Sequence, residues 1–443
     1  MASDDITILM GGHGYPFTGY YDLTDAEEEI LKKVPFHGGL DGVSEATCEY
    51  LPKNFKVHVL VDSNELYPEV YQPKDHGNVW VHSLPSISFA SGSELGYLYT
   101  PQGMPVGKFI EGHFDSRLPT LKEIIPKILS ESDGPVIAHM QDYFCGPMGE
   151  ELMKMGVPLI FQAHLSAYRP QYSETFVKGR LDDVRLVFER EACERAYVVV
   201  AVSNALRNEL LQAYKLAPEK VQVIPNGVDT KRFRPPTDED IERNKAYFAR
   251  LNIREPDKDF IHSRGRLDEA KGLDNVVMAF KKFSPNHPGC NLVITALGHP
   301  DSYKQLLNVR DSLPGDIRSR VTILNQRVNV VAFDQNCAVA VYPSIREACG
   351  LVALESGACE RPVVVGDVGG FRETVIEEYT GTHVNPYSID DIAEGIERAY
   401  QNREPWGKNA RNHVRSKYQW EDRIRDYDKL YHKVLRLNEI YRE

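Results

Sequence analysis

The sequence predicts an α/β protein made of two doubly wound parallel sheets. Short runs of β-branched and apolar residues alternate with helical stretches, a pattern typical of parallel strands joined by crossover helices. The alternation stops after residue 224 and begins again at residue 260. The chain has 443 residues, more than a single hydrophobic core usually supports. We therefore expect two Rossmann-like domains, each with its own sheet.

The predicted strands form two groups, one on each side of this break. In the first half we expect strands at residues 6–10, 56–61, 79–83, 136–140, 158–162, 197–202 and 221–224. In the second half we expect them at residues 260–263, 291–297, 321–324, 338–342 and 362–366.

Two further segments set the expected domain boundaries. Residues 226–259 are rich in proline and charge and lack a strand pattern, so we expect a linker there. Residues 406–443 carry apolar and aromatic side chains spaced three and four apart, which predicts an amphipathic helix. The expected parts are an N-terminal Rossmann-like domain at 1–230, a C-terminal Rossmann-like domain at 231–405, and a helical segment at 406–443 that packs back on the body. Ligands of open α/β sheets bind beyond the carboxyl ends of the strands, so the two sheets should face a cleft between the domains.

Composition and charge exclude several classes of protein. Hydrophobic residues make up 42% of the chain and charged residues 26%, as in globular proteins. The formal net charge of −12 provides no overall positive field for nucleic acid or an anionic membrane. No apolar run approaches the ~20 residues of a membrane span, and the first residues lack the pattern of a secretory leader. We expect a cytoplasmic protein that binds small molecules, without a nucleic-acid partner or a membrane span; the pattern specifies no oligomeric state.

The seven cysteines are scattered along the chain and never form a C-x-x-C pair. Their number is odd, and their spacing suits neither a disulfide framework nor zinc ligands. We predict reduced thiols that bind no metal.

The most informative segment is residues 343–355. A predicted strand ends at Tyr342, a loop follows, and a helix should begin near Gly350. The first backbone N–H groups of a helix have no partners inside it, so this helix start is a potential anion site. The residues that would form it are Cys349, Gly350, Leu351 and Val352.

Two glutamates flank this potential anion site. Glu347 lies in the loop before the helix, and Glu355 lies one to two turns inside it, where a carboxylate can accept hydrogen bonds from vicinal hydroxyls. Carboxylates on both sides of a phosphate site suit a sugar nucleotide. The alternative is that both are solvated surface acids. The glycine-rich stretch 366–370 favours the first interpretation, because glycine permits close approach of the backbone to a ligand.

Residues 343–355 resemble the E-x7-E signature of the family 4 retaining glycosyltransferases, the group that contains sucrose synthase and sucrose-phosphate synthase. Residues 263–272 resemble the family's G-R-L-x-x-x-K-G stretch, and residues 201–204 and 224–229 resemble two further landmarks. The motifs occur in the family's order. The resemblance implies the GT-B fold, in which two Rossmann-like domains face an interdomain cleft. It makes residues 1–230 the acceptor-binding domain and residues 231–405 the nucleotide-sugar-binding domain.

The resemblance also implies an activity. A hexosyl group, by default glucose from UDP-glucose, would pass with retention of configuration from a nucleoside diphosphate sugar to a small soluble acceptor. In the family, the Arg and Lys of the second motif hold the donor diphosphate, which assigns Arg266 and Lys271. Glu347 would orient the donor sugar and Glu355 the ribose.

Two further roles are carried over from the family to the N-terminal half. A Gly-Gly turn that abuts the diphosphate corresponds to Gly38 and Gly39, and the active-site histidine corresponds to His164. His164 follows a predicted buried strand, where a histidine can also be purely structural. His139, with Asp142 after the preceding strand, is a second candidate.

The charge that develops on a leaving diphosphate must be offset by a metal ion or by fixed cations. No D-x-D motif stands in a suitable loop, and no cluster of histidines and carboxylates suits a metal. We therefore predict no metal and no other cofactor, with Arg266 and Lys271 beside the helix start in that role. The alternative is that both are solvated surface cations.

Basic residues gather in the N-terminal half near the expected acceptor region. Cations beside a cleft in an acidic chain suggest a phosphate or carboxylate on the acceptor, most simply a sugar phosphate. The alternative is that they belong to solvated faces. The candidate acceptor-binding residues are Lys108, Arg117, His139, Arg169, Lys178 and Arg180.

Three other functions stay open. Residues 347–351 also resemble the E-P-C-G-L stretch of starch and glycogen synthases, although the bacterial enzymes usually lack an acid at the position of Glu355. A non-catalytic nucleotide-sugar-binding protein, or a nucleotide-sugar epimerase, could use a similar fold.

Overall fold

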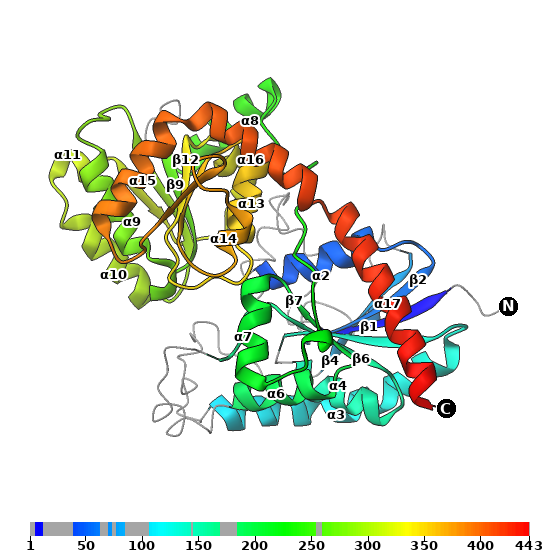
Figure 1. The fold of residues 1–443 in the computed structure, drawn as a ribbon. Helices are drawn as coiled ribbons and strands as arrows, with labels where there is room; N and C mark the ends of the chain where they lie inside the picture. Colours follow the sequence, from blue (N-terminus) through cyan, green and yellow to red (C-terminus); the bar gives the residue numbers. More distant parts are fainter. Residues whose placement is uncertain are drawn as a thin grey trace. The chain divides into compact units, whose positions relative to one another are not determined.

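The computed structural model describes residues 5–11, 39–62, 70–72, 77–84, 106–142, 145–168, 184–253 and 259–442. The chain forms two compact units, and each holds one sheet (Figure 1). Unit 1 comprises residues 1–225 and 420–443, and unit 2 comprises residues 226–419.

The sheet of unit 1 is parallel except at one edge. In the described part of the chain its strands are β1 (Ile6–Gly11), β2 (Phe55–Asp62), β3 (Val70–Tyr71), β4 (Val79–Leu84), β5 (Val136–Gln141), β6 (Leu159–Ala163), β7 (Val198–Ala201) and β8 (Val221–Val223). Their order across the sheet is β3-β4-β2-β1-β5-β6-β7-β8. β3 pairs antiparallel with β4, and the other pairs are parallel.

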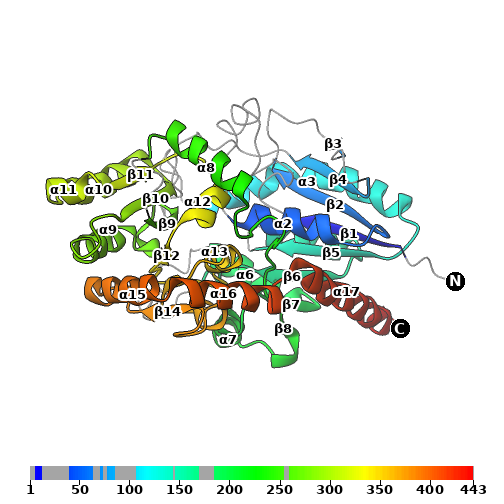
Figure 2. The same cartoon turned by 90° about the horizontal axis from the view of Figure 1, so that it is seen from above.

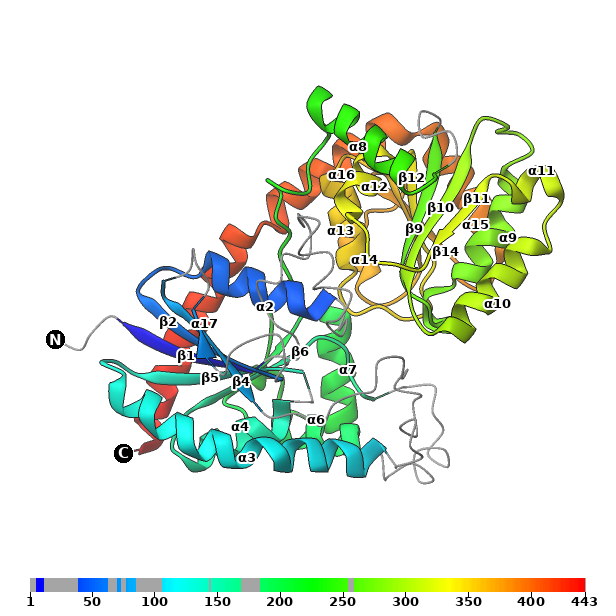
Figure 3. The ribbon, with the colours of Figure 1, turned by 180° about the vertical axis from the view of Figure 1, so that it is seen from behind.

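Helices cover both faces of this sheet. They are α2 (Gly39–Tyr50), α3 (Val106–Glu131), α4 (Gly146–Lys154), α6 (Val184–Arg195), α7 (Asn204–Tyr214) and α17 (Trp420–Arg442). α3, α4 and α6 pack against one another on one face, and α2 packs with α17 on the other (Figure 3). A two-sided cover of this kind is what a parallel sheet requires.

The sheet of unit 2 is parallel throughout its described strands. These are β9 (Phe260–Arg266), β10 (Asn291–Leu297), β11 (Val321–Leu324), β12 (Val339–Tyr342), β13 (Val363–Gly366) and β14 (Gly381–Val384). They are ordered β11-β10-β9-β12-β13-β14. The helices of unit 2 are α8 (Asp238–Arg250), α9 (Leu273–Phe283), α10 (Pro300–Asp311), α11 (Gly315–Arg318), α12 (Val330–Asn336), α13 (Leu351–Ala358), α14 (Phe371–Thr374), α15 (Ile389–Gln401) and α16 (Arg403–Lys417).

Unit 2 has a hydrophobic core on each face of its sheet, because successive strand residues point to opposite faces. Ile261 and Leu292 belong to the core that includes α9 and α15. Their neighbours Phe260 and Val293 belong to the other core, together with Phe248 of α8. Strands buried on both faces are continuous apolar runs, which made them recognisable in the sequence.

The prediction of two doubly wound parallel sheets is confirmed, and every predicted strand is present. β9 is longer than predicted and extends to Arg266, because the polar residues at its carboxyl end obscure the apolar pattern. β3 and β14 were not predicted. β3 has only two residues, and glycine and histidine interrupt the apolar pattern of β14.

The compact units end at other residues than the predicted domains. The predicted segment 406–443 is two helices, of which α16 lies in unit 2 and α17 in unit 1. α16 packs beside α13 (Figure 2). The chain divides after Gln419, at the place where the Val228 N–H donates to the Tyr418 carbonyl at 2.7 Å.

The stretch 226–259, expected as a linker, carries α8 and belongs to unit 2. Thr237 and Asp240 cap the helix reciprocally, so that its first turn is stable despite the preceding prolines. Phe248 anchors α8 in the core of unit 2.

Candidate active site

The two motif segments of unit 2 flank the point at which the strand order reverses. β9 and β12 are neighbours in the sheet, with β10 and β11 on one side and β13 and β14 on the other. In open α/β sheets, ligands bind beyond the carboxyl ends of the strands at this switch point. The loop after β9 carries residues 267–272, and the loop after β12 carries residues 343–350. The fold thus places both segments at the expected ligand site of this unit.

Lys271 and Glu347, one from each loop, form an ion pair. Lys271 Nζ lies 2.9 Å from Glu347 Oε2, and the two side chains are 22% and 18% exposed. The loops are also joined through the backbone, because the Ile345 N–H donates to the Ala270 carbonyl at 2.9 Å. The predicted diphosphate cation and the predicted sugar-binding acid therefore meet.

Arg266 lies at the end of β9 and is more open to solvent. Its side chain is 54% exposed, and Nε donates to Asp268 Oδ2 at 3.0 Å. It lies at the start of the loop that carries Lys271, but its side chain pairs with Asp268 and not with the Lys271–Glu347 pair.

Glu355 is held by a buried arginine that the sequence did not single out. Arg264 NH2 donates to Glu355 Oε2 at 2.5 Å and to Asp334 Oδ2 at 2.9 Å. Asp334 is fully buried and also accepts a hydrogen bond from Ser356 Oγ at 2.9 Å. Burial would raise the pKa of the Asp334 carboxyl, but the charge of Arg264 and the hydrogen bonds keep it below its usual value. The available sequence signal was a cation directly after the predicted strand at residues 260–263.

Burial raises the pKa of Glu355, while the charge of Arg264 opposes that rise. Arg264 itself stays charged, because the two carboxylates outweigh the cost of burial and raise its pKa well above the usual value. Glu355 Oε1 is not part of this ion pair. Arg264 thus orients the carboxylate through Oε2, and Oε1 can bind another partner.

α13 begins at Leu351 behind an uncapped turn. Gly350 has φ +83° and no side chain caps the helix, so the first amides of α13 are available to an anion. A Cβ at Gly350 would lie 2.5 Å from the Phe371 ring. Cys349 is buried, and Leu351 and Val352 are half-buried. The predicted helix start is confirmed.

The glycines after β13 pack against the Glu347 loop. A Cβ added to Gly366 would lie 2.2 Å from the Ser344 carbonyl oxygen. A Cβ added to Gly369 would lie 2.0 Å from the Glu347 carbonyl oxygen. The Gly370 N–H donates to the Glu347 carbonyl at 2.9 Å. The structure shows that these glycines permit close approach to this loop, and their approach to a ligand stays a prediction.

In unit 1 the strand order reverses between β1 and β5, and β6 is the next strand. His164 directly follows β6 and is half-buried, with Nε2 2.6 Å from Gln141 Oε1 at the end of β5. Burial and the neighbouring His139 lower the pKa of His164 to about 3. His164 is therefore neutral at physiological pH.

Glu189 of α6 holds the loop that follows His164. Glu189 Oε2 accepts hydrogen bonds from Ser166 Oγ at 2.7 Å, from the Ala167 N–H at 2.9 Å and from the Tyr214 hydroxyl. Burial raises the pKa of Glu189 to about 8. The sequence gives no sign of this role, because Glu189 stands at an ordinary position in a predicted helix and in no motif.

His139 lies inside unit 1 and has no exposed surface. Nδ1 is 3.0 Å from the Tyr431 hydroxyl, and Nε2 is 2.9 Å from Gln162 Oε1. A fully buried ring with both nitrogens engaged offers no atom to an acceptor. The prediction that His139 binds the acceptor is therefore wrong. His139 belongs instead to a network of buried hydrogen bonds.

The predicted acceptor cations are only partly covered by the described residues. Arg117 of α3 is 2% exposed, and burial lowers its pKa to about 10. Lys108 falls in the same helix, but its side chain is outside the described part. Gly39 begins α2. Gly38, Arg169, Lys178 and Arg180 lie outside the described residues.

The described residues show no metal centre, disulfide or membrane-spanning helix. No group of three or more His, Cys, Asp or Glu side chains is arranged to hold a metal ion there. All seven cysteines are free and buried. No helix in these parts of the chain is long and apolar enough to cross a membrane.

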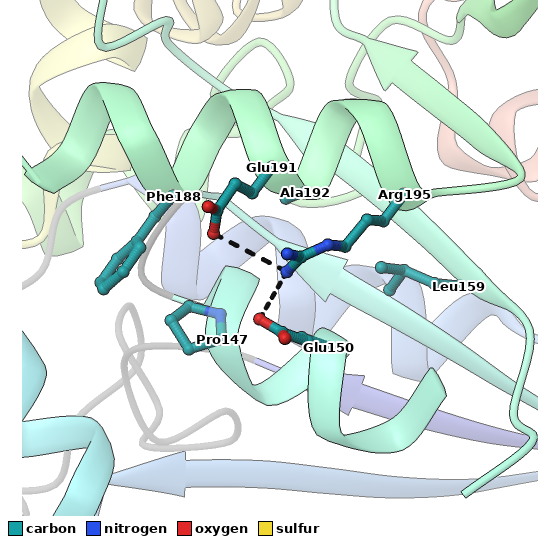
Figure 4. A pocket seen from close by; sticks show the side chains of 7 residues that line it. All are labelled: Pro147, Glu150, Leu159, Phe188, Glu191, Ala192 and Arg195. Atoms are coloured by element: carbon teal, nitrogen blue, oxygen red, sulfur yellow. Dashed lines mark ion pairs between the residues drawn. The ribbon is translucent and has the colours of Figure 1, made fainter. Parts of the chain in front are cut away.

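A small hollow lies between α4 and α6 (Figure 4). Arg195 NH1 lies 2.5 Å from Glu150 Oε2 and 3.7 Å from Glu191 Oε2 beside it. Its volume of about 10 Å³ is at the lower limit for one water molecule, so it is no substrate site.

Two family models match the chain, one in each half. The model described as Glycosyltransferase Family 4 matches residues 37–232, and the model described as Glycosyl transferases group 1 matches residues 244–413. The motif segments of unit 2 lie in the second match.

Individual proteins of known name are similar as well. The chain is 30% identical to the D-inositol 3-phosphate glycosyltransferase of Paenarthrobacter aurescens over 292 residues, 63% of this chain and 68% of that protein. Several other curated relatives are matched over about three fifths of their own length.

Two solved structures share the fold. Sucrose-phosphate synthase from Thermosynechococcus elongatus gives a TM-score of 0.70 at 22% identity, over 98% of this chain and 100% of that one. Anabaena HepE in complex with UDP-glucose gives 0.67 at 17% identity, over 96% and 99%.

Proposed function

The chain belongs to glycosyltransferase family 4, and from this premise we propose that it transfers a hexosyl group, by default glucose, from a nucleoside diphosphate sugar to a phosphorylated acceptor. The observation that carries the proposal is the set of donor-binding groups at the β9–β12 switch point. Lys271, Glu347 and Glu355 gather there beside the uncapped start of α13.

Unit 2 would bind the donor. The amides at the start of α13 and the Lys271 ammonium are suited to a diphosphate, because both favour negative charge. Glu347 would then accept hydroxyls of the sugar, and Glu355, oriented by Arg264, those of the ribose. The complex of Anabaena HepE with UDP-glucose supports UDP-glucose as the first donor to test.

The reaction would retain the configuration at the anomeric carbon. The acceptor oxygen forms its bond to C1 on the face from which the diphosphate departs, and its proton passes to the departing phosphate oxygen. The protein then supplies orientation and charge stabilisation. Lys271, Arg266 and the α13 amides would offset the charge on the leaving group.

An anionic acceptor is supported by the names of similar proteins. The similar proteins include an inositol 3-phosphate glycosyltransferase and a sucrose-phosphate synthase, whose names include a phosphorylated sugar or cyclitol.

The proposal is tested by product formation from radiolabelled donors. UDP-, GDP- and ADP-sugars are first ranked by thermal shift, since a donor at 100 times its dissociation constant stabilises the folded state by ~2.7 kcal/mol. The best donor is then incubated with phosphorylated sugars, the matching free sugars, a glucan primer and no acceptor. We expect a product with the phosphorylated acceptors. A primer-dependent polymer would indicate a synthase, an altered sugar without acceptor an epimerase, and donor binding without any product a non-catalytic protein.

Transfer should also continue in excess EDTA. Arg266, Lys271 and the α13 amides provide positive charge without a metal, so a chelator should leave the initial rate unchanged. The measurement is the transfer rate with EDTA and with added magnesium or manganese. Loss of activity that either metal restores would contradict metal independence.

A further inference from the structure

A chain of buried hydrogen bonds leads from α17 to His164. The Tyr431 hydroxyl lies 3.0 Å from His139 Nδ1, and His139 Nε2 lies 2.9 Å from Gln162 Oε1. Gln162 Oε1 also accepts from the Tyr427 hydroxyl at 2.9 Å. His139, Gln162 and the neighbouring Gln141 have no exposed surface.

Gln141 is the member of this cluster that touches His164. It is the last residue of β5, and in the sheet it pairs with Gln162 of β6. Its amide oxygen lies 2.6 Å from His164 Nε2. Its amide nitrogen lies 3.5 Å from His139 Nε2, but that ring nitrogen donates its proton to Gln162 Oε1 and so accepts no hydrogen bond from Gln141. Strand pairing and burial therefore hold Gln141 in place beside the histidine.

The contact determines which nitrogen of His164 carries the proton. An amide oxygen only accepts hydrogen bonds, so Nε2 must be the protonated nitrogen. In a neutral imidazole the other nitrogen, Nδ1, then has a free lone pair. Among the residues that the structure describes, no hydrogen-bond partner of His164 Nδ1 is found.

We propose that Gln141 is a positioning residue that fixes His164 as the Nε2–H tautomer, so that Nδ1 accepts a hydrogen bond from a substrate hydroxyl. The inference rests on the proposed function for its substrate. In this arrangement His164 is a neutral hydrogen-bond acceptor, and the cationic side chains bind the phosphate groups. The ionisable group that acts on His164 is His139 on β5, and Glu189 on α6 holds the loop that follows His164.

The direct test is nitrogen-15 NMR of the full-length protein with labelled histidine, in which the His164→Asn variant identifies the His164 signals. We expect a protonated Nε2 and an unprotonated Nδ1 in the wild type. The Gln141→Met variant keeps the length of the side chain but removes the acceptor, so its His164 should populate both tautomers. The Gln141→Glu variant retains an accepting oxygen and should restore the Nε2–H form.

Activity provides the second readout. Gln141→Met should lower kcat/KM about 10-fold, as expected from the loss of one orienting hydrogen bond, and Gln141→Glu should recover part of that loss. Gln222→Met on β8 is the matched control and should leave both readouts unchanged.

A wild-type His164 protonated at Nδ1 would overturn the proposal, as would the same tautomer in the wild type and in Gln141→Met. These NMR outcomes do not depend on turnover. Failure of the proposed function would appear separately, as a wild-type protein that forms no product with any donor and acceptor.

Discussion

Glu355 shows how neighbouring charges orient one side chain of the candidate donor site. Arg264 binds one carboxylate oxygen, and the same guanidinium is fixed from behind by the fully buried Asp334. Removing one partner of such a buried pair leaves the other charge unpaired, which is costly. The arrangement orients the Glu355 carboxylate, and the charge of Arg264 opposes the rise in its pKa that burial causes.

Glu355→Gln should weaken nucleotide binding by ~1 to 3 kcal/mol, because a neutral amide replaces a charged acceptor. The measurement is calorimetric titration with UDP or with the best nucleotide from the thermal-shift screen. Glu394→Gln, the same change at an exposed position of α15, is the control and should bind as the wild type does. Equal affinity in all three proteins would place Glu355 outside the donor site.

Glu189 should make the stability of unit 1 depend on pH. Burial raises its pKa from 4.5 to about 8, so the folded state binds this proton more tightly than the unfolded chain does. The resulting stabilisation is fully present below about pH 4.5 and is lost as the pH rises through about 8.

The Glu189→Gln variant isolates this contribution, because the buried histidines contribute equally in both proteins. We expect the difference in Tm, variant minus wild type, to increase from pH 5 to pH 8.5. The measurement is a series of thermal melts across that range. A difference that stays constant with pH would show that Glu189 has an ordinary pKa.

At the scale of elements, the β12–α13 loop depends on the loop that follows β13. A Cβ added to Gly370 would lie 2.1 Å from the Ala348 carbonyl oxygen, closer than two non-bonded atoms can approach. The Glu347 loop is thus held by backbone contacts that tolerate no side chain. This requirement explains the glycines without reference to a ligand.

Gly370→Ala should therefore displace the Glu347 loop, destabilise unit 2 by ~1 to 3 kcal/mol and weaken nucleotide binding. Chemical unfolding and nucleotide titration measure the two effects. Gly289→Ala is the matched control, because nothing lies within 4 Å of the added methyl group. Wild-type stability in Gly370→Ala would mean that the loop can move aside at little cost.

At the scale of the whole chain, the last helix completes the first unit. α17 stacks Trp420 on Tyr50 and packs Tyr431 beside Phe55, with ring centroids 6.4 Å and 5.8 Å apart. It also supplies the hydroxyls that hydrogen-bond to His139 Nδ1 and Gln162 Oε1. Unit 1 therefore contains residues from both ends of the sequence.

Leu430→Ala should lower the stability of unit 1 by ~2 to 5 kcal/mol and leave unit 2 unaffected, because Leu430 is 1% exposed in α17. Ile440→Ala, at a position 66% exposed in the same helix, should have almost no effect. Hydrogen exchange resolved by peptide separates the two units. Loss of protection in β9 to β14 after Leu430→Ala would contradict this assignment of the helix.

The sequence by itself determined the two sheets and most of the candidate donor-site residues. Parallel strands are buried on both faces, so they appear as apolar runs, and the polar loops between them were visible by contrast. Lys271, Glu347 and Glu355 could be named because they stand in motifs at the ends of such runs. The start of α13 at Gly350 followed from the same local pattern.

Only the tertiary structure decided which of these side chains meet. Arg264 reaches Glu355 because β9 and β12 are neighbours, although the two residues are 91 positions apart. His139 was assigned to the acceptor, but its partner Tyr431 comes from α17, 292 positions later. Periodicity reports burial and the type of element, which are local properties. Strand order and the return of the last helix depend on packing of the whole chain, and they decide which buried polar groups become partners.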